Sequence, residues 1–153
     1  MPVYALIVLA LMLILPIASS LLEVFLDNHG IFELSVFLKW FVFWPVGVRL
    51  LLAGLRQIIQ PRYTAETIFG LKSPEVQIVV RELGFANVAI GSIGTLSLAA
   101  PDWIVPAGLA GAIFYLLAGI NHALHKPRNR NQNFAMVSDL SIALVLGVLL
   151  LPI

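Results

Sequence analysis

The sequence contains no cysteine and little charge, and each shortage excludes a class of protein. Without cysteine there is no disulfide exchange, no thiolate nucleophile, no iron–sulfur cluster and no thiolate zinc site. Charged residues make up 11% of the chain and hydrophobic residues 60%, whereas soluble domains average about 25% charged residues. The net charge of +1 is too small to attract nucleic acid, so no such partner is expected. The composition is that of an integral membrane protein.

Long apolar runs fill most of the 153 residues. The runs are 3–26, 33–58, 75–100, 103–125 and 133–152. Each is far longer than a barrel strand of about ten residues and none alternates strictly, so strands are not expected. The expected fold is all-α: a polytopic bundle of five transmembrane helices in one domain, 1–153. Such a chain leaves no room for a soluble catalytic module.

The first run, 3–26, has to be distinguished from a secretory signal peptide. Ala18, Ser19 and Ser20 resemble a cleavage region, but no basic segment precedes the run and apolar residues resume after Ser20. The run is therefore expected to remain as a membrane span.

The connections between the runs are polar and rich in turn residues. The connection around Asp27 holds asparagine and glycine, 60–74 is bounded by two prolines, and 125–133 is basic and rich in asparagine. Within the second of these, "TAETIFGL" fits either a plain loop or one short interfacial helical turn. The plain loop is preferred.

Lysine and arginine are concentrated in two of these connections and predict an orientation. The basic residues that flank or fill them are Arg56, Arg62, Lys72, Lys126, Arg128 and Arg130. The other side has only Lys39, together with the acidic residues Asp27, Glu33 and Asp102. By the positive-inside rule we predict a multi-pass protein of the cell's inner membrane, with a cytoplasmic N-terminus and the C-terminus outside.

Five ionisable residues lie inside the runs, towards the predicted cytoplasmic side. At about 1.5 Å of rise per residue, Glu82, Arg49 and Asp139 lie roughly 12 Å from the inner end of their runs. His122 is somewhat shallower, and Arg81 adjoins Glu82. Charges at that depth cost roughly 2.5–3.5 kcal/mol each unless they are paired or hydrated. We therefore predict that Glu82 pairs with Arg49, and Asp139 with Arg81 or His122.

Small and polar residues recur at three- and four-residue steps on the third and fourth runs. The third run has Arg81, Gly84, Asn87, Gly91 and Gly94, and the fourth has Gly108, Gly111, Tyr115, Ala118 and His122, with Asn121 beside them. Such stripes let helices approach closely and let polar side chains hydrogen-bond between them. Two interpretations stay open: packing contacts alone, or a functional buried polar cluster. The cluster consists of Arg49, Arg81, Glu82, Asn87, Asn121, His122 and Asp139.

Three further features are assigned structural roles. Glu23 and Lys39 are brought together by the short connection between the first two runs, so an outer ion pair is expected. Arg56 is expected to be a phosphate-facing anchor. His122 and His125 are three residues apart, but this pair alone is a weak metal motif, and no metal site is predicted. No catalytic residues are predicted either, since the sequence has no glycine-rich phosphate loop and no spacing that indicates a Ser–His–Asp arrangement.

Three segments resemble a family of small uncharacterised bacterial integral membrane proteins that is distantly similar to DoxX-type four-helix membrane proteins. They are "SPEVQIVVRELGFANVAIGSIGTLSL", "FYLLAGINHALH" and "DLSIALVLGVLLL". The shared pattern is Glu82, Gly84, Phe85, Ala86, Asn87 and Gly91, with His122 on the fourth run. The resemblance implies a four-helix core, here with an added N-terminal span, and no established activity. DoxX relatives have been linked to quinone-coupled sulfur redox chemistry.

Two classes of function follow from these observations, and a membrane enzyme is a third and weaker option. The preferred one is a structural or partner subunit that forms a homo-oligomer, or docks a larger membrane complex, through small-residue faces such as 107–111 and 143–147. The alternative is a protein that binds or conducts a small polar solute, a proton or a quinone headgroup at the polar cluster. No cofactor is predicted, although a lipid or a quinone is compatible with the alternative.

Overall fold

The computed structural model describes residues 2–26 and 31–152. These residues are almost entirely helical and include no strand. Five helical stretches are long and apolar enough to span a membrane: Val3–Leu26, Leu34–Ile59, Pro74–Leu96, Pro101–Leu124 and Arg130–Leu150. The predicted all-α fold with five spans is confirmed. Residues 27–30, which include Asp27 and were predicted to lie on the outer side, are outside the described residues.

Each span begins and ends within a few residues of its predicted run. The first consists of α1 (Pro2–Leu9), the π-helical η1 (Ala10–Ile14) and α2 (Leu15–Leu26), and the second of α3 (Leu34–Phe41), the π-helical η2 (Val42–Arg49) and α4 (Leu50–Ile59). The third is α6 (Pro74–Leu96), the fourth is the 3₁₀ turn η4 (Pro101–Trp103) with α7 (Ile104–Leu124), and the fifth is α8 (Arg130–Leu150).

The connection between the second and third spans is helical, so the preference for a plain loop there was wrong. It contains α5 (Pro61–Tyr63) and the π-helical η3 (Thr64–Ile68). The amide of Leu71 donates to the carbonyl of Ala65 over 2.8 Å, and Gly70 ends the turn with a positive φ of 73°. Burial of Ala65 and Ile68 against the bundle gives this short segment the apolar contacts that it would lack as an isolated helix. Residues 61–69 are called the strap below.

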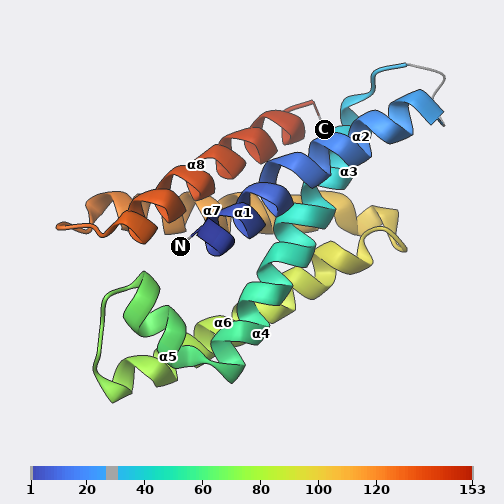
Figure 1. The fold of residues 1–153 in the computed structure, drawn as a ribbon. Helices are drawn as coiled ribbons and strands as arrows, with labels where there is room; N and C mark the ends of the chain where they lie inside the picture. Colours follow the sequence, from blue (N-terminus) through green and yellow to red (C-terminus); the bar gives the residue numbers. More distant parts are fainter. Residues whose placement is uncertain (1, 27–30, 153) are drawn as a thin grey trace.

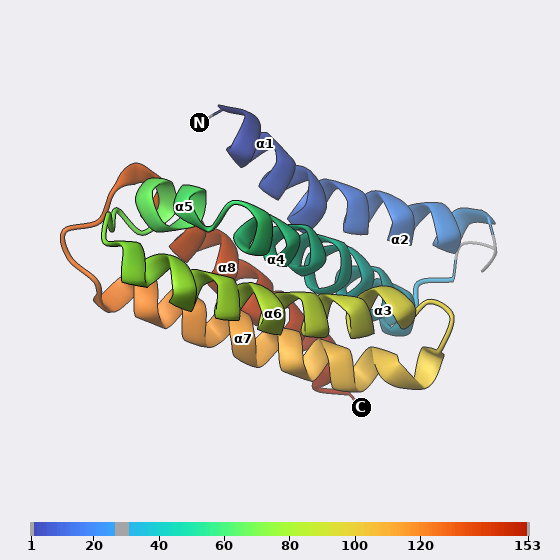
Figure 2. The ribbon, with the colours of Figure 1, turned by 90° about the horizontal axis from the view of Figure 1, so that it is seen from below.

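The bundle is built from two closely packed helix pairs, α4 with α6 and α7 with α8. The pairs meet where α3 and η2 contact α7 and α8, and the first span lies along α3 and η2 on the outside (Figures 1 and 2). Towards the other end the pairs diverge, and the strap lies at that end of the molecule (Figure 1). The cavity described below is lined by residues of both pairs and of the strap.

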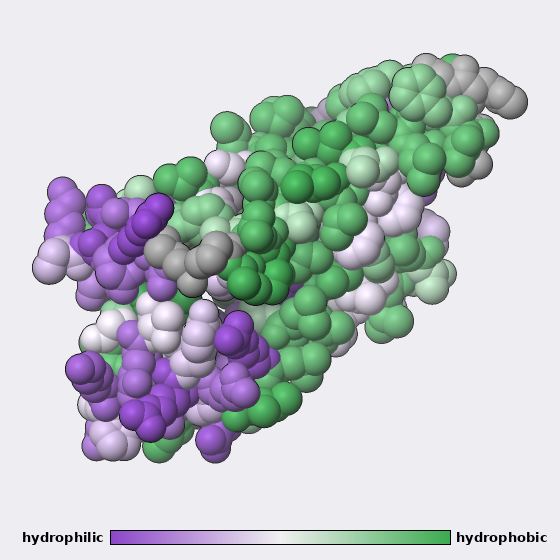
Figure 3. All heavy atoms as spheres, viewed as in Figure 1, coloured by the Kyte–Doolittle hydropathy of each residue, from purple (hydrophilic) through white to green (hydrophobic). Residues whose placement is uncertain are grey.

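The end of the molecule that holds the strap is also its polar end. The N-terminal end of α1, the strap and the connection between α7 and α8 lie together there, opposite the C-terminal end of α8 (Figures 1 and 2). Hydrophilic side chains gather at this end in Figure 3, and hydrophobic ones cover most of the remaining surface in that view. It is called the basic end below, because six of the nine Lys and Arg residues flank or fill its two connections. That this end faces the cytoplasm stays a prediction.

Glycine permits the close approach of α6 to the second span. A Cβ atom on Gly91 would lie 2.4 Å from the amide nitrogen of Leu51, and one on Gly94 would lie 2.7 Å from that of Gly47. Neither position has room for a side chain, so this part of the small-residue stripe on the third span serves packing. The other stripe faces inwards as well, since a Cβ on Gly111 would clash with Val46.

The packing of the small residues within one chain limits which faces are free to form the predicted oligomer. Ala107 and Gly111 are buried within one chain, and a Cβ on Gly108 would contact Val42. The face at 107–111 is therefore already occupied by the second span. Gly147, on the other proposed face, has nothing within 4 Å of an added Cβ. Self-association stays a prediction.

Candidate functional site

A proline inside the second span shapes the segment that carries Arg49. Pro45 cannot donate a backbone hydrogen bond, and the helix around it widens into the π-helical η2, which ends at Arg49. The carbonyl of Pro45 accepts a hydrogen bond of 2.5 Å from the hydroxyl of Tyr115 on α7. Within a membrane each backbone polar group needs a protein partner, and Tyr115 supplies one here.

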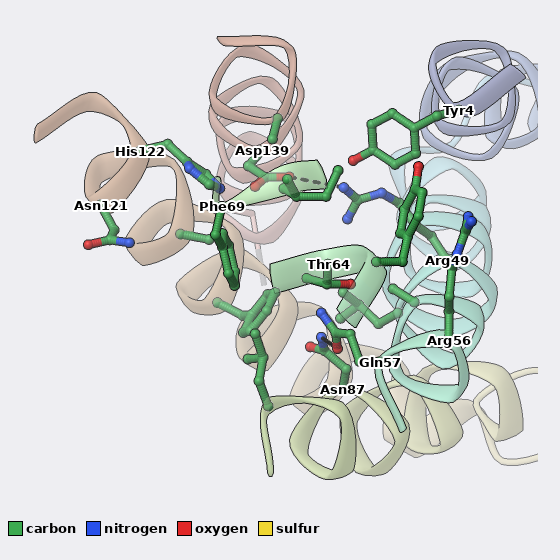
Figure 4. Close-up of a pocket in the computed structure, with 18 of the residues that line it drawn as sticks. Tyr4, Arg49, Arg56, Gln57, Thr64, Phe69, Asn87, Asn121, His122 and Asp139 are labelled. Atoms are coloured by element: carbon green, nitrogen blue, oxygen red, sulfur yellow. Dashed lines mark hydrogen bonds and ion pairs between the residues drawn. The ribbon is translucent and has the colours of Figure 1, made fainter. Parts of the chain in front are cut away.

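Arg49 connects three spans through its guanidinium group. Nη1 donates to the hydroxyl of Tyr115 over 3.0 Å, and Nη2 donates to Oδ1 of Asp139 on α8 over 3.2 Å. The guanidinium also lies over the Tyr115 ring, 5.1 Å from its centroid. In Figure 4 the hydroxyl of Tyr4, on the first span, points towards the same group. The network therefore ties η2, α7 and α8 together.

The carboxylate partner of Arg49 is thus Asp139, and the predicted pairing with Glu82 was wrong. Arg81 and Glu82 are both exposed on α6, and neither forms an ion pair among residues 2–26 and 31–152. The prediction compared how deep the residues lie along their helices. It did not consider the direction in which each side chain points around its helix axis. Glu82 is two residues from Gly84, about 200° around the helix, so it points away from α4 when Gly84 faces it.

The pairing predicted for Asp139 with Arg81 or His122 was also wrong, because its partner is Arg49. Arg81 lies about one turn before Gly84, beyond the closest contact between α6 and the second span. His122 is half-buried on α7 and lines the same cavity as Asp139. Metal ligands do not gather here: in the described part of the chain, no three His, Asp or Glu side chains come close enough to hold an ion.

Two buried amides face each other between α4 and α6. Nδ2 of Asn87 donates to Oε1 of Gln57 over 2.8 Å, and the two residues are 3% and 8% exposed. Oδ1 of Asn87 is buried and accepts no hydrogen bond from any described residue. The polar cluster predicted from the sequence included Asn87 but not Gln57. The sequence could have indicated Gln57, because it is an uncharged polar residue in an apolar run and lies about two turns after Arg49.

These groups line a cavity of about 360 Å³ between the diverging helix pairs. Five of the seven residues of the predicted polar cluster line it: Arg49, Asn87, Asn121, His122 and Asp139. The labelled side chains in Figure 4 come from all five spans and from the strap. The rest of the wall is mainly apolar, with Leu50, Leu83, Phe114 and Leu117 from the spans and Ile68 and Phe69 from the strap. The structure thus brings most of the cluster to one cavity, but Asn121 is exposed and not buried as predicted. The functional role of the cluster stays a prediction.

The strap is held in place by side chains at the start of α8. Three amide nitrogens donate to consecutive strap carbonyls over 3.1 Å each: Asn131 to Thr67, Asn129 to Ile68 and Gln132 to Phe69. Asn129 and Gln132 also form the capping box that begins α8. The asparagine-rich connection, read from the sequence as a basic loop, therefore fastens the strap.

Two arginines at the basic end have specific partners. The guanidinium of Arg56 lies 3.6 Å from the centroid of the Tyr63 ring, and both residues line the cavity. Nη1 of Arg128 donates to the carbonyl of Ala123 over 2.7 Å, near the C-terminus of α7. Arg56 is exposed, so its predicted contact with lipid phosphate stays a prediction.

The ion pair predicted near the opposite end is confirmed. Nζ of Lys39 donates to Oε1 of Glu23, and the indole of Trp40 donates to Oε2 of the same carboxylate over 2.7 Å. Both carboxylate oxygens therefore have partners. This supports a structural role for the pair, which joins α2 to α3.

One family model matches residues 5–152, nearly the whole chain, and describes a family of unknown function (DUF6790). The chain belongs to this family. The match agrees with the uncharacterised family expected from the sequence, but it shows neither a link to DoxX proteins nor a bacterial origin. No curated protein and no solved structure matches the chain.

Proposed function

We propose that this membrane protein binds a small molecule in the cavity at its basic end. Ligand sites in proteins are concave, mostly apolar and about 300–1,000 Å³ in volume, with a few convergent polar groups. The cavity of about 360 Å³ has these properties, because aromatic and aliphatic walls surround polar side chains from all five spans. This is the alternative function inferred from the sequence.

The observation that carries the proposal is that a buried ion pair forms part of the cavity wall. Arg49 and Asp139 have side chains only 13% and 8% exposed, yet both line the open space. A pair that served only to join helices could be enclosed by close-packed side chains, as protein interiors generally are. Burying two charges also costs free energy that an apolar contact would not. Their place in the wall favours a binding role.

The lining residues limit the chemistry of the ligand. Arg49 and Arg56 carry two positive charges and Asp139 one negative charge, so the wall has a net charge of +1 with His122 neutral. This balance suits a neutral or anionic polar group. The apolar wall suits an aliphatic or ring-shaped body. An anionic lipid and a quinone headgroup both fit this description.

Cavity blocking tests the proposal. Ala118 lines the cavity, whereas Ala110 lies on the exposed side of the same helix. We expect decylubiquinone or oleic acid to raise the melting temperature of the wild-type protein and of Ala110→Phe in lipid nanodiscs, because a ligand that binds only the folded state stabilises it. Ala118→Phe should abolish the increase. Equal increases in all three proteins, or none in any, would argue against binding in this cavity.

A second candidate function, that of a homo-oligomeric subunit, is supported by the exposed charges of α6. Arg81 and Glu82 point out of the bundle on a span, where unpaired charges cost roughly 2.5–3.5 kcal/mol each at the membrane centre and less near its edge. A two-fold axis along the membrane normal would place Arg81 of each copy at the depth of Glu82 of the other. Such a dimer would pair all four charges.

Charge exchange tests this dimer. Glu82→Arg would place like charges at the interface and should convert a dimer to a monomer in native mass spectrometry from mild detergent. Arg81→Glu combined with Glu82→Arg restores opposite charges and should restore the dimer. A wild-type monomer in both detergent and nanodiscs would rule the arrangement out.

A further inference from the structure

The Asn87–Gln57 pair is a buried part of the cavity wall, and one of its polar atoms has no hydrogen-bond partner among the described residues. Both amides line the cavity, and their one mutual hydrogen bond leaves Oδ1 of Asn87 without a donor among the described residues. This bond uses Oε1 of Gln57, so the NH₂ group of Gln57 takes no part in it. Among the described residues no hydrogen bond joins the pair to the Arg49–Asp139 network, so the pair is treated as a separate part of the wall.

Two primary amides that share one hydrogen bond leave at least one carbonyl oxygen and one NH₂ group outside that bond. Each amide has a carbonyl oxygen and an NH₂ group, so this holds whichever way round the two groups lie. The pair therefore presents an edge with a donor next to an acceptor. A molecule with the complementary edge can form two hydrogen bonds to it at once.

The backbone holds this edge in a fixed position. Gly54 and Gly84 bring α4 and α6 so close that a Cβ on Gly84 would lie 3.0 Å from the Cβ of Gln57. Asn87 follows Gly84 by about one turn on the same face of α6. A preorganised polar edge loses little freedom when a ligand binds, which strengthens its discrimination between ligands.

The cavity wall around this edge is mainly apolar, so hydrogen bonding to the edge should decide which ligands bind well. Leu83, Ile68 and Phe114 line the same cavity, and Thr64 adds one buried hydroxyl. In such surroundings a polar group left without a partner is costly, so a site with paired polar groups rejects analogues that lack the matching atom. A ligand with acceptors only would leave Oδ1 of Asn87 unsatisfied.

We propose that the ligand of this cavity carries an N–H or O–H donor next to a carbonyl acceptor, and that Asn87 and Gln57 recognise this edge. Primary amides, lactams and protonated carboxylic acids have this edge, whereas esters and quinones lack the donor and should bind more weakly without being excluded. The inference rests on the proposed binding function and narrows its ligand class.

The test compares two probes of nearly the same shape, 2-naphthamide and methyl 2-naphthoate. Binding to the full chain in nanodiscs is measured by saturation-transfer NMR, with Ala118→Phe nanodiscs as the reference for partition into lipid. We expect the wild-type protein to bind the amide about tenfold more tightly than the ester. In the double variant Asn87→Leu and Gln57→Leu, which removes both amides and leaves neither unpaired, the two probes should bind within about twofold of each other.

The outcomes separate this inference from the proposal on which it rests. Equal binding of amide and ester to the wild-type protein, blocked by Ala118→Phe, would overturn the donor requirement and leave the cavity as a binding site. If neither probe binds, the inference fails, and the decylubiquinone and oleic acid experiment decides the proposed function separately. The comparison of the two probes on wild-type protein needs no variant in the amide pair, so poor folding of the double variant would not remove the test.

Discussion

The guanidinium of Arg49 donates from Nη2 to Oδ1 of Asp139 over 3.2 Å and joins the second span to the fifth, 90 residues further along the chain. Tyr115 on the fourth span accepts from the same guanidinium and donates in turn to Pro45. The pair is both a tie between the two diverging helix pairs and part of the cavity wall. Its removal should therefore affect stability in a way that a surface pair would not.

Loss of one member of this pair should be worse than loss of both. Asp139→Ala leaves the Arg49 charge buried without its carboxylate, and we expect a loss of about 3–5 kcal/mol in unfolding free energy. Arg49→Met combined with the same Asp139→Ala substitution removes both charges and should recover most of that loss. A double-mutant cycle measured by denaturant unfolding in detergent checks this, with Asp102→Asn, at an exposed carboxylate, as the control. Additive losses would show that the two side chains are not coupled.

A methyl group at the contact between α6 and the second span should destabilise the bundle. Gly91→Ala would place Cβ 2.4 Å from the backbone nitrogen of Leu51, so the helices must separate, at an expected cost of about 1–3 kcal/mol. Gly147→Ala is the matched control, because nothing lies within 4 Å of its added Cβ. The control should be neutral or stabilising by up to about 1 kcal/mol from helix propensity. Equal melting temperatures for the two variants would contradict the close contact.

The strap should become more mobile when its fastening to α8 is weakened. Gln132→Ala removes the hydrogen bond to the carbonyl of Phe69 and half of the capping box, a local loss of about 1 kcal/mol. Backbone amides of residues 64–71 should then exchange with deuterium about fivefold faster. Asn133→Ala, which removes a contact with Arg128 and none with the strap, is the control. Unchanged exchange in Gln132→Ala would mean that the side-chain clamp does not hold the strap.

The two ends of the bundle should react with impermeant reagents from opposite sides of the membrane. The chain has no cysteine, so single cysteines can be placed without background. Asp102 and Lys126 are exposed at opposite ends of α7, and by the positive-inside rule Asp102→Cys should label from outside and Lys126→Cys only after permeabilisation. Labelling of both positions from one side of intact cells would exclude the predicted topology.

Hydrophobic length was enough to predict the fold class and the spans. Runs of about 20 apolar residues have few alternatives to membrane helices, because the backbone must satisfy its own hydrogen bonds in lipid. The pair of Glu23 and Lys39 was also predictable, since a short connection brings its two residues together. The strap was not, because its helical turns depend on contacts with α8 that lie more than 60 residues away.

The sequence by itself determined which residues are polar inside the membrane and roughly how deep they lie, because depth follows from counting along a helix. Only the tertiary structure decided which of them meet. Arg49 pairs with Asp139 because the rotation and divergence of four helices place these two side chains in one cavity wall, while the same rotation turns Glu82 outwards. Rotation about a helix axis depends on which face packs against which neighbour, and that is a property of the whole bundle.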